Sequence, residues 1–184
     1  MPNPLEKLEV SGKTKTTELQ ITSGAAGGKV LTSDAAGNAS WQAATGGNAN
    51  TGIEISTFAN QSTATGVITK VILDSKYSDP SAAFSTATSE WTIPSSGFYH
   101  INAALSFFTS LPANSQVIIY IRVNGVSVKQ KYAITSSQST IDIAADMPLV
   151  ANDIVTVYIL QNSGAPATIS TGRNNTYLSG FKVY

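Results

Sequence analysis

Few residues in this 184-residue sequence have the types and spacing that catalysis requires. A Ser-His-Asp site needs a histidine as its base. The one histidine, His100, lies inside a predicted strand directly after a turn at Gly97. Cysteine is absent, which excludes a thiolate nucleophile, a thiolate metal site and disulfide bonds. We therefore interpret His100 as a structural residue.

Pairs of carboxylates are the second kind of group that could do chemistry. Two such groups can hydrolyse a glycosidic bond. Asp142, Asp146 and Asp153 are close in sequence, as are Asp74 and Asp79. Aspartates in loops and at strand ends are more often solvated caps, and we expect that role here.

The sequence predicts neither a metal site nor a cofactor site. Calcium prefers several oxygen ligands, and no dense Asp/Asn loop is present to supply them. The glycine-rich segments 24–28 and 46–47 lack both the Gly-Lys-Ser/Thr ending of a phosphate-binding loop and a following helix. We predict a protein that is not an enzyme, with no metal and no cofactor.

Recognition of sugars is the chemistry that the remaining candidates fit best. In two predicted loops, 109–116 and 161–175, polar groups lie beside aromatic residues. Such a surface binds sugars by hydrogen bonds and ring stacking. The alternative is that the aromatic members pack in the core or at a subunit contact and that the paired asparagines form a turn. The candidate receptor-binding residues are Phe108, Tyr132, Arg173, Asn174, Asn175 and Tyr177.

The charge of the chain is low and balanced. Eleven basic residues offset eleven acidic ones, and 12% of residues are charged, whereas about 25% is usual. The two arginines, Arg122 and Arg173, and the lysines are scattered, so the sequence has no basic stripe for nucleic acid. A neutral polar surface of this kind suits a structural protein that hides its apolar faces in an assembly.

The elements that must position these residues are β-strands. Helical periodicity is weak, and period-two alternation recurs; for example, Ile101, Ala103, Leu105 and Phe107 fall on one face of a strand. Asn124-Gly125 between two alternating runs predicts a type I′ hairpin. The all-β pattern and regular spacing are typical of a sandwich or jelly roll, with predicted strands at 66–73, 90–93, 97–108, 117–123, 126–132, 140–144, 153–161 and 176–184.

Residues 1–50 differ from the rest of the chain. Short β-prone pieces at 8–10, 18–21 and 29–31 carry too little apolar surface for a core of their own. They form either a shaft, in which strands pair with neighbouring chains, or a flexible tether. The linker-like composition of segment 43–51 favours the tether. The residues that a shaft or anchor would bury are Val10, Leu19, Ile21, Val30, Leu31 and Trp41.

The sequence at the N-terminus predicts no secretory signal, since residues 1–10 lack a basic start, an apolar core and a cleavage site. No apolar run approaches the ~20 residues that span a bilayer, so membrane insertion is not predicted. Work outside the producing cell would then need another route, such as release with a virus particle. We divide the chain into a shaft, anchor and linker, 1–50, and a head, 51–184.

The predicted head contains several short sequence motifs, and their order along the chain matches that of a known family. Trp91, Thr92, Pro94, Gly97 and Tyr99 fill a Phe-Thr-Xaa-Pro-Xaa-Xaa-Gly-Xaa-Tyr segment, with Trp in place of Phe. The RVNG hairpin, the LVANDIVTVYI segment and the terminal TYLSGFKVY follow. From about residue 53 onward the chain resembles the C1q and TNF-like jelly roll. The resemblance implies a homotrimer whose outward sheet faces fill the centre, with candidate interface residues Tyr99, Ile101, Tyr158, Leu160, Phe181 and Tyr184.

The segment GKVLTSDAAGNASWQ, residues 28–42, resembles repeats that precede head domains in phage tail fibres. It takes the place of a collagen stalk, and no Gly-X-Y repeat is present. The resemblances imply a trimeric virion fibre of a bacteriophage. Its head would attach to a host-surface glycan or protein, and its N-terminal segment would join a capsid or tail protein. The alternatives are a purely structural decoration fibre, a bacterial surface or extracellular adhesin, and a depolymerase.

Overall fold

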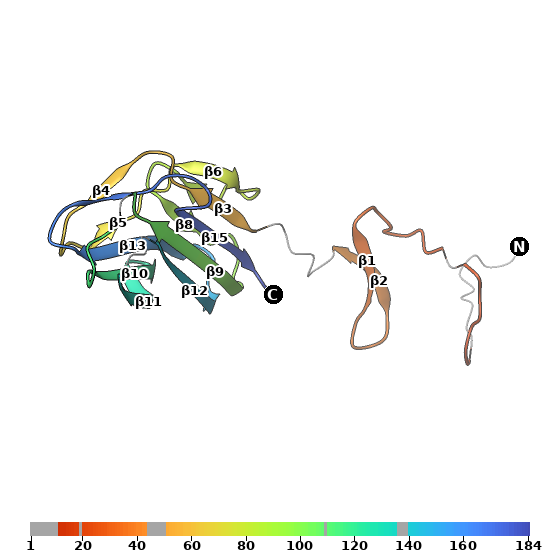
Figure 1. The fold of residues 1–184 in the computed structure, drawn as a ribbon. Coiled ribbons are helices and arrows are strands. Elements are labelled where there is room, and N and C mark those ends of the chain that lie inside the picture. The colour runs from red at the N-terminus through yellow and green to blue at the C-terminus, as the bar shows by residue number, and fades with distance from the viewer. Residues whose placement is uncertain (1–10, 19, 44–50, 109, 136–139) are drawn as a thin grey trace, which may run out of the picture. The chain divides into compact units, whose positions relative to one another are not determined.

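The computed structural model describes residues 11–18, 20–43, 51–108, 110–135 and 140–184. These residues form strands and turns and contain no helix. The chain divides into two compact units, Met1–Gly47 and Asn48–Tyr184, which are described separately. The prediction of an all-β fold is confirmed (Figure 1).

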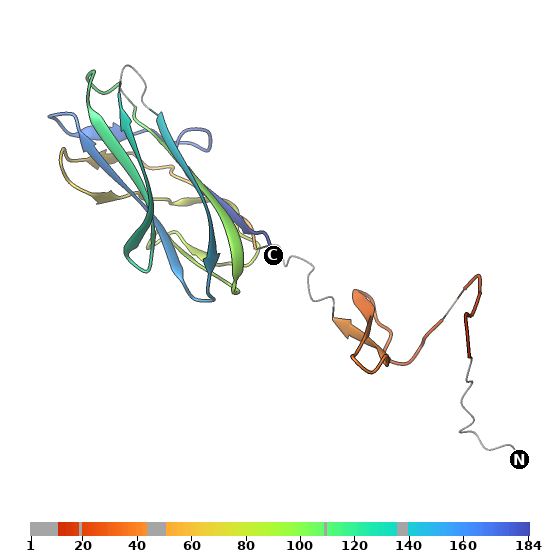
Figure 2. The same ribbon diagram turned by 90° about the horizontal axis from the view of Figure 1, so that it is seen from below.

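The head is a sandwich of two antiparallel sheets (Figures 1 and 2). One sheet, here the β10 sheet, has the order β11-β10-β13-β8-β7, with β5 also paired to β13. The other, here the β9 sheet, has the order β12-β9-β15-β3-β6, and β14 pairs with β4 separately. The strands are β3 (Ile53–Ser56), β4 (Gln61–Thr63), β5 (Thr69–Lys70), β6 (Ser75–Ser78), β7 (Phe84–Ser85), β8 (Glu90–Thr92), β9 (Gly97–Ser106), β10 (Gln116–Val123), β11 (Val126–Ile134), β12 (Thr140–Leu149), β13 (Ile154–Asn162), β14 (Ala167–Ile169) and β15 (Tyr177–Lys182).

The core lies between the two sheets. On β9 the predicted apolar face is confirmed, because Ile101, Ala103 and Leu105 have no exposed surface. Trp91 of β8 fills the centre and meets the Tyr99 ring edge to face, with centroids 5.7 Å apart at 78°. Alternate residues on each strand therefore point away from the core, and they make up the outer faces of the head.

The hairpin between β10 and β11 is as the sequence predicts. Asn124 and Gly125 have φ angles of 51° and 80°, both in the left-handed region that a type I′ turn requires. The Asn124 side chain ties this turn to the next one, since its Nδ2 donates to Asp153 Oδ1 (2.8 Å) and its Oδ1 accepts from Ile154 N (2.9 Å). The hairpin appears as the neighbouring green and teal strands in Figure 2.

Acid should weaken the link between these turns. Val150 N and Asn124 Nδ2 donate to the Asp153 carboxylate and lower its pKa below the ordinary 3.8. The ionised group thus stabilises the fold above the ordinary pKa, and that contribution is lost as the pH falls through the lowered one. Asp153→Asn should cost less than about 1 kcal/mol at pH 7. In urea titrations the difference from wild type should shrink below pH 4; a constant difference would contradict this.

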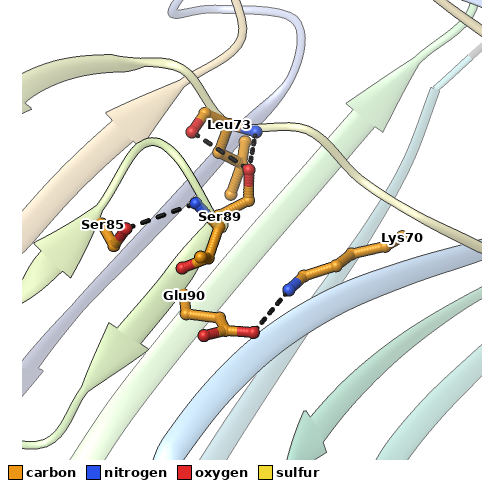
Figure 3. Close-up of polar contacts among 6 residues, drawn as sticks. Lys70, Leu73, Ser85, Ser89 and Glu90 are labelled. Carbon is orange, nitrogen blue, oxygen red and sulfur yellow. Dashed lines mark hydrogen bonds and ion pairs between the residues drawn. The ribbon is translucent and has the colours of Figure 1, made fainter.

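The predicted strand 66–73 is wrong in extent, because β5 covers only Thr69 and Lys70. After β5 the backbone N–H groups of two residues donate to side-chain oxygens instead of to a neighbouring strand. Ile72 N donates to Gln61 Oε1 (2.9 Å), and Leu73 N donates to Ser89 Oγ (3.0 Å; Figure 3). A periodic sequence pattern cannot show such side-chain acceptors.

Strand β12 runs farther than the predicted 140–144 and includes Pro148. Proline has no N–H to donate, which an edge strand tolerates on its open side. Because β12 is at the edge of the β9 sheet, Pro148 does not end it.

In the N-terminal unit, β1 (Lys29–Ser33) and β2 (Ala39–Ala43) form a hairpin. Asp34 holds its loop by accepting from Ala36 N (2.9 Å) and Asn38 N (2.8 Å). Trp41 Nε1 donates to Ile21 O (3.0 Å). The β-prone piece 29–31 lies in β1, whereas the described residues of 18–21 are not in a strand.

Little of this hairpin is covered. Val30 and Leu31 remain 43% and 40% exposed, and an isolated two-stranded hairpin is marginally stable in water. Two of the predicted shaft residues, Val10 and Leu19, lie outside the described residues. Shaft or tether therefore stays a prediction.

Candidate binding surfaces of the head

The outer face of the β9 sheet carries four aromatic rings, here the aromatic patch: the half-buried Phe98 and His100 and the exposed Phe181 and Tyr184. Phe98 and Tyr184 stack with centroids 5.3 Å apart and planes 2° apart. His100 lies opposite Phe181 in the strand register, with ring centroids 5.4 Å apart. Phe181 is still 51% exposed and Tyr184 74%. The rings form two packed pairs, and one ring of each pair stays exposed.

His100 also pairs with a carboxylate. Its Nδ1 lies 2.6 Å from Asp146 Oδ1 across β9 and β12. Among the described residues, no serine or threonine side chain forms a hydrogen bond with this ring. The pair thus lacks the nucleophile of a Ser-His-Asp site, and its contacts are those of a surface structural residue.

Beside Phe181, the same face is hollowed by a cavity of about 660 Å³. Arg173 is fixed there by a two-pronged ion pair with Glu54: Nε donates to Oε1, and Nη2 donates to Oε2 at 2.6 Å. Its guanidinium also lies 4.9 Å from the centre of the Tyr77 ring. The bond from Arg173 lowers the pKa of Glu54, and the bond to Glu54 raises the pKa of Arg173. The cation and the carboxylate cancel, so the hollow is polar and close to neutral.

The structure brings three of the six predicted receptor residues together: Arg173, Asn174 and Tyr177 line the hollow. Asn175 is beside them but donates to Thr171 O (2.7 Å), as a turn residue would. The remaining lining residues are Gly52, Ile53, Glu54, Ser78, Asn102, Ser179, Gly180 and Phe181.

The other two predicted receptor residues lie elsewhere. Phe108 follows β9 and is 73% exposed, which contradicts the alternative that it packs in the core. Tyr132 is on β11, in the opposite sheet, and is 49% exposed. Neither lines the hollow.

Four polar residues that line the hollow were not predicted from the sequence: Glu54, Ser78, Asn102 and Ser179. Glu54 is 119 positions from Arg173. Asn102 donates from Nδ2 toward Tyr177 Oη at 3.5 Å and is 75 positions from it. No local motif links such residues; the signal that existed was Asn102 on the outward face of a strand already predicted.

The six candidate interface residues separate into three groups. Tyr99 and Ile101 are fully buried inside the subunit's own core, so they offer no surface to a neighbour, and this corrects their assignment. Phe181 and Tyr184 belong to the aromatic patch. Tyr158 and Leu160 are half-buried on the outer face of the β10 sheet.

Strand β11 is an exposed edge of the β10 sheet. Four of its apolar side chains face solvent in the single chain, and long apolar edges are usually covered in native proteins. Their exposed fractions are 66% for Val126, 45% for Val128, 49% for Tyr132 and 57% for Ile134.

Among the described residues, no cluster of three or more His, Asp or Glu side chains could hold a metal ion. The same part of the chain contains no helix with the length and apolar character to cross a membrane.

No protein-family model and no curated protein matches the chain. Solved structures do: Eiger TNF from S. frugiperda is 10% identical, covering 73% of this chain and 93% of its own, with a TM-score of 0.53. Murine APRIL at pH 5.0 is 14% identical, covering 73% and 99%, with a TM-score of 0.55. The head has a TNF-like jelly-roll fold. The globular domain of zebrafish complement 1qA, 15% identical over 72% and 97%, has a TM-score of 0.46.

This jelly roll confirms the fold that the resemblance of the head implied. At 10% and 14% identity the likeness shows the fold alone. The resemblance of segment 28–42 to phage tail-fibre repeats stays a prediction.

Proposed function

We propose that the chain is a non-catalytic, trimeric fibre protein of a virion, of the bacteriophage type, whose head attaches to a receptor on the host surface. The observation that carries the proposal is the aromatic patch. Exposed apolar surface of this kind marks a contact site when it is contiguous. Phe181 and Tyr184 lie in it, and both are half exposed or more in the single chain.

A threefold ring needs two different surfaces on each subunit, because every subunit meets one neighbour on each side through a head-to-tail contact. The described head exposes two suitable surfaces: the aromatic patch on the β9 sheet and the apolar edge β11. Packing the edge of one subunit on the patch of the next would cover both. The same contact would remove an edge strand that otherwise invites aggregation.

The N-terminal unit would serve as shaft and anchor. Val30 and Leu31 of its hairpin stay exposed in one chain, and neighbouring copies would bury them. The virion component that receives this segment would be a capsid or tail protein.

The hollow beside Phe181 is the receptor site of this proposal. Its arginine is already neutralised by Glu54, and the remaining lining offers the amides of Asn102 and Asn174, serine hydroxyls and the half-buried Tyr177 ring. Such groups fit the hydroxyls and the apolar ring face of a neutral sugar. Three weak sites on one rigid tip would gain avidity without chemistry.

Asn174→Ala tests the hollow with little risk to the fold, because Asn174 is exposed and its side chain makes no hydrogen bond among the described residues. Loss of one hydrogen bond should weaken binding of the labelled full chain to its preferred glycans about three- to tenfold. A glycan array followed by surface titration would measure this.

The matched control is Gln116→Ala, a polar residue that is exposed at the start of β10, and it should bind as wild type. Unchanged binding of Asn174→Ala would place the receptor site elsewhere. An array that stays silent for the wild type would favour a decoration fibre.

A further inference from the structure

A second polar and aromatic site lies on the outer face of the β10 sheet. Tyr120 of β10 and Tyr158 of β13 are opposite each other in the register, and both alternate with core isoleucines and valines. The Arg122 guanidinium lies 4.1 Å from the centre of the Tyr158 ring and 5.8 Å from that of Tyr120. Arg122 Nε donates to Ser127 Oγ at 3.2 Å. We call these four residues the Tyr–Arg platform.

Arg122 is a fixed cation without a carboxylate partner. In the described part of the chain, no Asp or Glu oxygen lies within 4 Å of it, although Arg173, Lys70, Lys76 and Lys131 each have one. Its Nε is used by Ser127, which orients the plane of the guanidinium. The two terminal NH₂ groups have no protein acceptor among the described residues, and they form a planar pair of donors.

The carboxylate on the same face does not compensate Arg122. Glu90 of β8 bonds to Lys70 Nζ at 2.8 Å, as Figure 3 shows. That bond lowers the pKa of Glu90 and keeps it ionised on Lys70. Lys70 lies opposite Tyr158 in the register, so the ion pair borders the platform. With Lys70 and Glu90 cancelling, the platform retains one positive charge.

Two tyrosine hydroxyls add to the hydrogen-bonding groups of the platform that have no protein partner. The Tyr120 and Tyr158 hydroxyls form no hydrogen bond with any described residue, and the rings themselves are largely covered. Two residues away on the same face, Ile118 lies opposite Leu160 and so extends an apolar strip beside the charge. A ligand that fits needs a carboxylate for Arg122, hydroxyls for the tyrosines, and an apolar ring face for the strip.

We propose that the Tyr–Arg platform binds acidic saccharides through their carboxylate. The carboxylate would accept two parallel hydrogen bonds from the terminal NH₂ groups of Arg122, a geometry that lysine cannot reproduce. The platform lies on the β10 sheet, whereas the hollow lies on the β9 sheet. The platform keeps a positive charge and would bind an acidic sugar, whereas the arginine of the hollow is neutralised and suits a neutral sugar. A head with both sites recognises a glycan that carries neutral and acidic sugars.

The test compares two ligands that differ only in the carboxylate: methyl β-D-glucuronide and methyl β-D-glucoside. Saturation-transfer NMR on the full chain, with titration, should show binding of the glucuronide and at least tenfold weaker binding of the glucoside. Raising the salt concentration should weaken the glucuronide signal. Equal affinity for the two ligands, or no glucuronide binding, would overturn the proposal.

Three variants locate the site. Arg122→Gln should weaken glucuronide binding at least tenfold, and Arg122→Lys, which keeps the charge, should recover only part of it. Lys129→Gln is the matched control, because it removes one exposed cation from β11 that has no ion pair among the described residues. Wild-type binding by Arg122→Gln, or equal losses in Arg122→Gln and Lys129→Gln, would overturn the platform.

Circular dichroism and solution mass would confirm that each variant folds and assembles. The same variants and ligands also separate this inference from the proposed function. If Asn174→Ala loses the binding of neutral glycans and Arg122→Gln keeps it, the hollow is supported as the receptor site. That conclusion holds whether or not the platform binds the glucuronide.

Discussion

Trp91→Ala is expected to lower the free energy of unfolding of the head by about 3–5 kcal/mol, the range for deleting a fully buried large aromatic side chain. Trp91 has no exposed surface, meets Tyr99 edge to face and belongs to the one core cluster that both sheets share. Urea denaturation followed by circular dichroism would measure the loss. A change below about 1 kcal/mol would contradict this view of the core.

Trp91→Phe is the control for this substitution. The indole Nε1 is buried and forms no hydrogen bond in the described structure, which costs stability. Phenylalanine removes that unsatisfied donor along with part of the ring, so the two effects partly cancel. We expect a loss below about 2 kcal/mol. A larger loss for Phe than for Ala would show that the cavity is not the cause.

Gly180 explains why the large ring fits. A Cβ at this position would come within 2.7 Å of Trp91 Cζ3 and 2.9 Å of the His100 carbonyl oxygen. Real Cβ atoms do not approach backbone oxygens so closely, so the glycine on β15 is required by the tryptophan on β8 and by β9 beside it. The SGF motif near the end of the chain is therefore a packing motif.

Phe181→Lys is expected to convert the proposed trimer to a monomer. It places a charge in the aromatic patch, where a neighbouring subunit would have to bury it unpaired, at a cost of several kcal/mol. In the single chain Phe181 is 51% exposed, so the subunit itself should fold as before. Light scattering would report the mass, and circular dichroism would report the fold.

The control is Phe58→Lys, which makes the same change at a residue that is 79% exposed and outside both the aromatic patch and β11. It should leave the mass unchanged. If Phe181→Lys keeps the wild-type mass, the patch is not the subunit contact. If both variants lower the mass equally, general charge repulsion is the cause.

Much of the head could be predicted from the sequence because its long strands are periodic. In β9 and β10 the apolar residues that face the core alternate along the strand, such as Val117, Ile119 and Ile121, and the Asn124-Gly125 turn has its own conformational signature. The short strands β3, β4, β6, β7 and β14 were not predicted, since two to four residues show too little periodicity. Their place is set by partners far along the chain, such as Thr63 opposite Ala167.

The binding surfaces were harder to predict than the fold. Arg173 and Tyr177 are neighbours in sequence, but Glu54, which sets the charge of the hollow, comes from the first strand of the head. Arg122 looks like one of two scattered arginines until the register places it over Tyr158, 36 positions away, without a carboxylate. Tyr99 and Ile101 were assigned to the interface for a similar reason. A strand pattern shows which residues share a face, but it does not show which face packs against the second sheet.

The most direct test of the central claim is the solution mass of the intact wild-type chain, measured by light scattering over a range of concentrations. We expect three times the chain mass of 19.2 kDa, constant on dilution. A mass of 19.2 kDa at all concentrations would contradict the trimer, and with it the proposed fibre.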